Sequence, residues 1–354
     1  MFESYHQFIY FHWVNRKSFI KSGSGILGAV FLPAVGFSNN TPKKKFTIPP
    51  GLKPGDTIGV TCPSGYMTRN EMLPAFKQIQ SWGFRIITGK TVDARDGTFG
   101  GSDTERAEDF QFMLDNPDIK AIMCGRGGYG AVRIIDDLDF SAFIKKPKWI
   151  IGFSDATVLH THINSKYHIA SIHSKMLNSF PNNFETAMPI QQDTILSIRD
   201  ALMHLKKMNY TAPFNEYNKR GEATGELIGG NLRTIENLSG TASEIDTDGC
   251  ILFLEETGEY LYNIDRMLWN LKRAGKLSKL KALIIGGFKI RQQTNPAEEM
   301  NRTVQQVVLE KVQEYDYPVC FDFPVGHQYD NFALKCGVAH RLTVTQSGTQ
   351  LIEI

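Results

Sequence analysis

Short apolar runs alternate with helical segments along the first half of the chain. Strands are predicted within segments 55–65, 84–90, 119–130 and 148–155. Helices are predicted over segments 69–82, 102–117, 131–139 and 156–167. The second of these helices is expected to be capped by Ser102 or Asp103. This alternation predicts a parallel sheet covered on both faces, in which functional sites gather at the C-terminal ends of the strands.

The pattern weakens between residues 178 and 219, where one helix is predicted over 193–205. Beyond it, segment 223–240 predicts a strand, a glycine turn and a helix. Further strands are predicted in 249–259, 280–288 and 318–327, helices in 262–275 and 303–315, and a hairpin at 340–354. These elements predict a mixed α/β domain that is richer in strands. The expected division is an extension (1–45), an N-terminal α/β domain (46–178), an interdomain connection (179–219) and a C-terminal domain (220–354).

The first 45 residues have the layout of an export signal. Three basic residues, Arg16, Lys17 and Lys21, precede an apolar stretch over residues 26–37 and a polar exit. The stretch is too short for a comfortable membrane span. The alternatives are a disordered or interfacial extension, or a misassigned start codon. An exported, periplasmic protein is expected if the signal is used, and a cytoplasmic one otherwise.

Composition narrows the function classes. The chain has 354 residues, of which 42% are hydrophobic, and a net charge of +2 without a basic block in its body, which argues against a nucleic-acid partner. Its five cysteines include no CxxC pair and are expected to be buried free thiols. No histidine spacing indicates a metal site, so no metal is expected.

Ser154 lies where the run WIIGFSDA passes from a strand to a helix. A nucleophile elbow has the pattern G-x-S-x-G, because glycines relieve crowding at a strained turn. Here Gly152 supplies the first glycine and the small Ala156 replaces the second. The alternative is that Ser154 or Asp155 only caps the helix that follows.

A glycine-rich segment, CGRGGYG at 124–130, ends the preceding strand. Its backbone N–H groups could face an oxyanion or a phosphate. The alternative is a tight turn with an exposed arginine, Arg126.

Two more strand ends carry candidate groups. Glu255 directly follows an apolar strand, whereas Glu256 and Glu259 are more simply explained as a solvated turn. His327 follows a strand, a proline and a glycine, a placement that suits a positioned base. A serine, a carboxylate, a histidine and a glycine-rich loop together are the parts needed for acyl transfer.

Five motifs, RGGYGA, IIGFSDATVLH, GELIGGNL, LFLEETGEYLYNIDRML and FPVGH, resemble in order and spacing those of the LD-carboxypeptidase family of serine peptidases, which includes the muramoyltetrapeptide carboxypeptidases. The resemblance covers the chain from about residue 53 to its end. It implies a class I glutamine amidotransferase-like or flavodoxin-like N-terminal α/β domain with a β-rich C-terminal α/β domain.

The resemblance also implies roles for single residues. Ser154 would be the nucleophile, His327 the base and Glu255 the acid that orients it, with the N–H groups of Gly128 and Asp155 as the oxyanion hole. The implied reaction releases the terminal D-alanine of peptidoglycan tetrapeptides without a cofactor, in a homodimer. Arg126 is the candidate residue to bind the terminal carboxylate of the substrate.

The chain departs from the family at one place near the expected cleft. Many relatives have H-G-P where this chain has His173, Ser174 and Lys175. The substrate therefore stays open. One alternative is the microcin-immunity branch of the family, which cleaves peptidyl-nucleotide amides. Another is a nucleotide- or ligand-binding module without catalysis.

Overall fold

The first sheet has six strands in the order β11-β5-β4-β3-β1-β2. The computed structural model describes residues 45–354, apart from the Pro296 side chain, so all but the last residue of the signal-like segment lies outside it. The sheet consists of β1 (Thr57–Thr61), β2 (Arg85–Thr88), β3 (Ile119–Cys124), β4 (Trp149–Gly152), β5 (Ser171–His173) and β11 (Leu334–Cys336). All neighbouring pairs are parallel except β11 with β5.

Side-chain alternation along the strands gives this sheet two apolar faces. In β4, Trp149 and Ile151 point into one core and Ile150 into the other, as the period of two requires. The first core is covered by α1 (Arg69–Ser81) and α5 (Pro189–Met203). The second core is covered by α2 (Asp103–Asp115), α3 (Ser141–Lys145) and α4 (Thr157–His162). The predicted sheet, covered on both faces, is confirmed.

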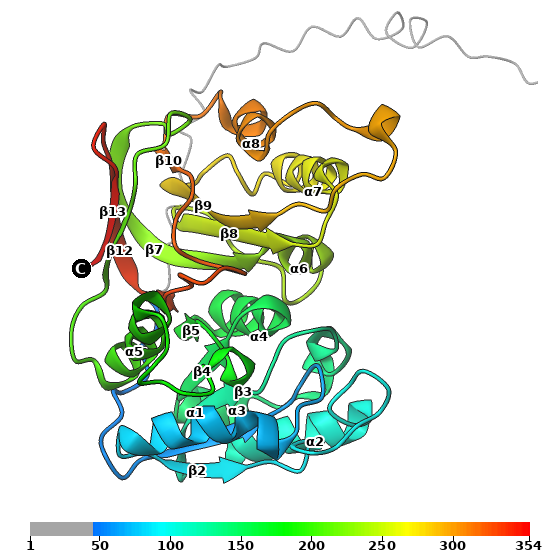
Figure 1. Cartoon of the computed structure of the whole chain (residues 1–354), viewed down its shortest axis with the longest axis vertical. Coiled ribbons are helices and arrows are strands. Elements are labelled where there is room, and N and C mark those ends of the chain that lie inside the picture. Colours follow the sequence, from blue (N-terminus) through cyan, green and yellow to red (C-terminus); the bar gives the residue numbers. More distant parts are fainter. Residues whose placement is uncertain (1–44) are drawn as a thin grey trace, which may run out of the picture. The chain divides into compact units, whose positions relative to one another are not determined.

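The second sheet has seven strands in the order β10-β9-β8-β7-β12-β13-β6 (Figure 1). They are β6 (Asn209–Ala212), β7 (Gly221–Asn231), β8 (Ile251–Thr257), β9 (Ala282–Lys289), β10 (Val319–Cys320), β12 (Ala339–Val344) and β13 (Thr349–Glu353). The pairs from β7 to β10 are parallel, and those from β7 through β12 and β13 to β6 are antiparallel. The expectation of a mixed, strand-rich second part and of a terminal hairpin is confirmed.

Helices cover only one face of the second sheet. α6 (Leu232–Asn237), α7 (Leu261–Arg273) and α8 (Val304–Val312) share a core with β8 and β9. On the other face, Phe253 of β8 packs in a core with Leu342 and Leu351 of the terminal hairpin. Both sheets thus offer their C-terminal strand ends to loops that carry the candidate residues.

Two predicted elements differ from the structure. Segment 131–139 forms two short 3-10 turns, Ala131–Arg133 and Ile135–Asp137, in place of a helix. Aspartates at its end would oppose the dipole of a continuous helix. Within 156–167, the α-helix ends at His162 and the chain continues as a π-helix over Ile163–Tyr167.

The segment between the two predicted domains contributes to both sheets. Helix α5 packs on the first sheet, whereas β6 pairs with β13 at the edge of the second. In the opposite direction, β11 leaves the C-terminal part and joins the first sheet beside β5. The proposed domain boundaries therefore stay a prediction.

Two smaller observations bear on the sequence expectations. All five cysteines are buried thiols, and no disulfide joins any two of them, as predicted. Among residues 45–354, no helix combines the length and the apolar character that crossing a bilayer requires.

Candidate active site

Ser154 lies on a sharp turn at the end of β4. Its φ of 61° is left-handed, a conformation that a non-glycine residue adopts at a cost and that is common at functional sites. A Cβ on Gly152 would lie 2.7 Å from the Cβ of Ala156, so the turn tolerates only this glycine opposite a small residue. Neither the 3-10 turn Ser154–Ala156 nor α4 has a side-chain cap at its N-terminus. The alternative that Ser154 or Asp155 caps the helix is therefore wrong.

The glycine-rich loop after β3 lies against this serine. A Cβ on Gly127 would be 3.1 Å from the Ser154 Oγ, so a larger residue would have to move the loop or the serine by a few tenths of an ångström. The Gly65 N–H donates to the Gly127 carbonyl oxygen at 3.1 Å. Because C=O and N–H of a trans peptide point in opposite directions, the Gly128 N–H points away from Gly65. Among the described residues, the N–H groups of Gly128 and Asp155 have no acceptor.

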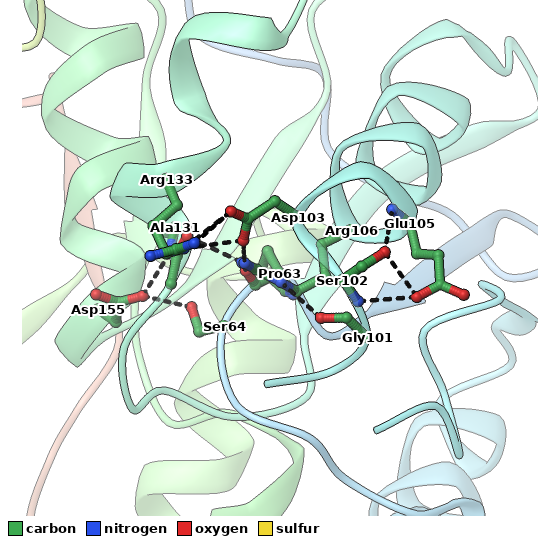
Figure 2. Close-up of polar contacts among 11 residues, drawn as sticks. Pro63, Ser64, Gly101, Ser102, Asp103, Glu105, Arg106, Ala131, Arg133 and Asp155 are labelled. Carbon is green, nitrogen blue, oxygen red and sulfur yellow. Dashed lines mark hydrogen bonds and ion pairs between the residues drawn. The ribbon is translucent and has the colours of Figure 1, made fainter. Parts of the chain in front are cut away.

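The Asp155 side chain ties three loops together beside the serine (Figure 2). Its Oδ2 accepts the Ser64 hydroxyl at 2.6 Å and the Ala131 N–H at 2.8 Å. Burial raises the pKa of this carboxyl above its ordinary value, and the two hydrogen bonds oppose that shift. The loop after β1 and the loop after β3 are thus anchored to the residue that follows Ser154.

A buried arginine binds backbone carbonyl oxygens of the same loops (Figure 2). Arg106 of α2 is fully buried and donates to the carbonyl oxygens of Pro63, Gly101 and Gly130. Its other partner, Asp103, also binds Arg133. The N-cap of this helix, expected at Ser102 or Asp103, is Ser102, in a capping box with Glu105. The missed signal was a charged residue on the apolar face of α2.

Glu255 and His327 meet at the C-terminal end of β8. The Nδ1 of His327 lies 2.6 Å from Oε2 of Glu255, whose side chain is completely buried. The turn before the histidine requires a glycine, because Gly326 has a φ of 104° and a Cβ there would lie 2.5 Å from the Glu255 Cβ. A bond at Nδ1 leaves Nε2 as the free nitrogen of the ring.

The expected solvated turn after Glu255 is wrong for Glu256. This carboxylate is buried and accepts the N–H groups of Arg233 and Thr257 and the amide of Asn231. Burial raises the pKa of Glu256 above its ordinary value. Because a parallel strand ends here beside the β7–α6 turn, the second carboxylate anchors that turn. Glu259 is partly exposed, and its Oε1 lies 3.9 Å from Nε of Arg233.

The histidine and the serine belong to neighbouring loops. The rings of His327 and Phe153, the residue before the serine, have centroids 4.9 Å apart. The two halves also meet where the Thr157 hydroxyl of α4 accepts the Asn231 N–H at 3.1 Å. Residues 154, 255 and 327, far apart in the chain, thus come from strand ends that face each other.

A pocket of about 380 Å³ opens beside His327, and its lining includes Phe153, Lys175 and Lys289. Arg126 is not part of this lining. Its Nη1 lies 3.5 Å from the Tyr66 carbonyl oxygen, and its Nε is buried without a partner among the described residues.

Comparison with known proteins agrees with this architecture. The chain matches the family models of the LD-carboxypeptidase N-terminal domain over residues 58–174 and C-terminal domain over residues 224–342. It is 30% identical to a probable murein peptide carboxypeptidase of Bacillus subtilis, over 86% of this chain and 94% of the relative. The crystal structure of muramoyltetrapeptide carboxypeptidase from Oxalobacter formigenes superposes with a TM-score of 0.73 at 27% identity, over 84% of this chain and 99% of that chain.

A third relative belongs to the immunity branch. The microcin self-immunity protein MccF of Escherichia coli is 26% identical over 81% of this chain and 90% of its own length. The two domain models, the relatives and the shared fold agree, and the chain belongs to the LD-carboxypeptidase family of peptidases.

Proposed function

We propose that this protein is a serine LD-carboxypeptidase that releases the terminal D-alanine from peptidoglycan tetrapeptides. The observation that carries the proposal is the 2.6 Å bond between Glu255 and His327, whose ring packs on Phe153, the residue before a serine in a left-handed turn. Relatives named murein peptide and murein tetrapeptide carboxypeptidases support the substrate class.

The proposed reaction begins with the Ser154 hydroxyl. Nε2 of His327 takes its proton as Oγ attacks the scissile carbonyl carbon. Glu255 accepts the Nδ1–H, which fixes the tautomer and stabilises the imidazolium. His327 then gives the proton to the leaving amine as the C–N bond breaks. Water, deprotonated by the same histidine, hydrolyses the acyl ester and restores the serine.

The oxyanion of the tetrahedral intermediate is expected to lie between the N–H groups of Gly128 and Asp155. Neither group has an acceptor in the described part of the chain. Asp155 directly follows the serine, and Gly128 follows Gly127, whose Cβ position lies against the serine side chain. The loop ties to Ser64, Ala131 and Arg106 hold these donors before substrate arrives. Donors oriented in advance are worth about 10²- to 10³-fold in kcat each.

Product analysis tests the proposal. Purified protein is incubated with a stem tetrapeptide ending in D-alanine, and the released amino acid is identified by chiral chromatography. Release of D-alanine supports the proposal. Cleavage of an aminoacyl-sulfamoyl adenylate without D-alanine release would favour the immunity-type activity, and nucleotide binding without turnover would favour a binding module.

Gly127→Ala should lower kcat by about 10- to 100-fold, because the added Cβ would lie 3.0 Å from the Ser154 Cβ and displace the nucleophile. The free energy of unfolding should change by less than about 1 kcal/mol. The measurements are steady-state kinetics and urea unfolding. The control for kcat is Gly249→Ala, where a Cβ meets no atom within 4 Å; its left-handed φ of 69° makes this variant less stable without touching the site. Equal kcat in the two variants would show that the space between residue 127 and the Ser154 side chain does not matter for the reaction.

Asp155→Ala should destabilise the fold by about 1–3 kcal/mol, because it leaves the buried Ala131 N–H without its acceptor. It should also lower kcat, since the loop that carries Gly128 loses its tie. Ser64→Ala removes only one of the two bonds and should have the smaller effect on both quantities. Thermal unfolding and kcat are measured side by side. A destabilised variant with unchanged kcat would show that the hydrogen bonds of the Asp155 side chain stabilise the loops without orienting the oxyanion hole.

A further inference from the structure

The pocket beside His327 has an unusual charge. Two lysines, Lys175 and Lys289, line it together with Ser179, Gln191 and Gln328, and no acidic side chain belongs to its lining. In the part of the chain that the structure describes, no ion pair joins either lysine to a carboxylate within 4.0 Å. The pocket is therefore a cationic hollow next to the proposed general base.

Lys175 is the more confined of the two. Its side chain is only 5% exposed, and Nζ donates to the Thr194 hydroxyl at 2.8 Å and to the Tyr329 carbonyl oxygen at 2.7 Å. An ammonium group has three N–H donors, and these two neutral acceptors leave one donor without a partner and no carboxylate in contact with the charge. Burial lowers the pKa of Lys175 to about 8, and the field of Asp330 opposes this shift. An anion in the pocket would supply the missing partner.

The proposed reaction says which part of a substrate enters this pocket. The general acid must reach the leaving nitrogen within hydrogen-bond distance, so the leaving group lies on the His327 side of the serine. The pocket is lined by His327 itself and by Phe153, which precedes the nucleophile. A leaving amino acid that enters it brings its free carboxylate to the lysines.

We propose that Lys175 binds the terminal carboxylate of the leaving amino acid, with Lys289 at the rim of the same subsite, and that this contact restricts the enzyme to free C-termini. The inference rests on the proposed function. It replaces the sequence-based candidate for this role, Arg126, which lies outside the pocket lining.

Paired substrates test the subsite. One tetrapeptide ends in D-alanine and the other in D-alaninamide, which keeps the shape and removes the charge. The wild type should have a kcat/KM about 10- to 100-fold higher for the acid, the effect of a hydrogen bond to a charged group. Lys175→Met should lose this preference by slowing the acid alone. Lys289→Met should reduce the preference less, because its side chain is exposed.

The matched control is Lys148→Met. Lys148 is equally buried, donates to two carbonyl oxygens and has its pKa lowered to about 8, but it precedes β4 at the end of the strand opposite Ser154. This variant should keep the preference for the acid.

Three results would overturn the subsite. If the wild type hydrolysed both peptides equally, the pocket would not bind the terminal carboxylate, and no variant would be needed to show it. An equal loss on both peptides in Lys175→Met would show a lysine that only anchors the His327 loop through Tyr329. Hydrolysis of neither peptide would remove the proposed function itself, a failure distinct from the other two.

Discussion

Ser154→Ala should abolish the release of D-alanine, with a fall in kcat of about 10⁵- to 10⁶-fold, as expected when a nucleophile that acts together with its base is lost. The fold should survive, because the serine hydroxyl has no hydrogen bond among the described residues and alanine adopts the same left-handed φ at a similar cost. Kinetics with the tetrapeptide and urea unfolding measure the two quantities.

A control serine separates chemistry from general damage. Ser165 is also partly buried, but its hydroxyl accepts the N–H of Asp246, far from the strand ends that carry the site. Ser165→Ala should keep kcat within about 3-fold of the wild type. If Ser154→Ala kept its activity as well, another residue would be the nucleophile and the triad would be wrong.

Glu255→Gln should lower kcat by about 10⁴-fold without removing the side chain's packing. A glutamine amide can no longer hold the Nδ1–H tautomer of His327 or stabilise the imidazolium, and loss of the orienting carboxylate in this way has an effect of that size. The bond at issue is the 2.6 Å contact between a completely buried oxygen and the ring. The measurement is kcat at the pH of maximal activity.

The neighbouring carboxylate is the control for this prediction. Glu256 is also buried, but it accepts backbone N–H groups of the next turn rather than the histidine. Glu256→Gln should therefore change the unfolding midpoint more than kcat. The opposite ranking, with Glu256→Gln the slower enzyme, would show that Glu256 rather than Glu255 orients the histidine.

The sequence predicted the parts of this site that follow from local pattern. Apolar runs located β1, β3, β4 and β8, and parallel pairing requires that loops after such strands share one edge. The approach of Ser154, Glu255 and His327 then depended on the family resemblance, because nothing local fixes how two sheets face each other. Their catalytic roles and the homodimer stay predictions.

The features that could not be predicted from the sequence depend on contacts between distant segments. Strand β11 is three residues long and exists through pairing with β5, so no periodicity marks it. Arg106 and Lys175 are charged residues in apolar surroundings, and composition alone assigns such residues to the surface. Their burial becomes intelligible only when the carbonyl oxygens that they bind, from other loops, are brought together.

Labelling with a fluorophosphonate probe shows whether Ser154 is the activated nucleophile. The hydroxyl of an activated serine displaces fluoride at phosphorus, and peptide mass spectrometry locates the adduct. We expect a single adduct on Ser154 in the wild type, with labelling greatly slowed in His327→Ala. An adduct on a different residue, or labelling of Ser154 at an unchanged rate without the histidine, would contradict it.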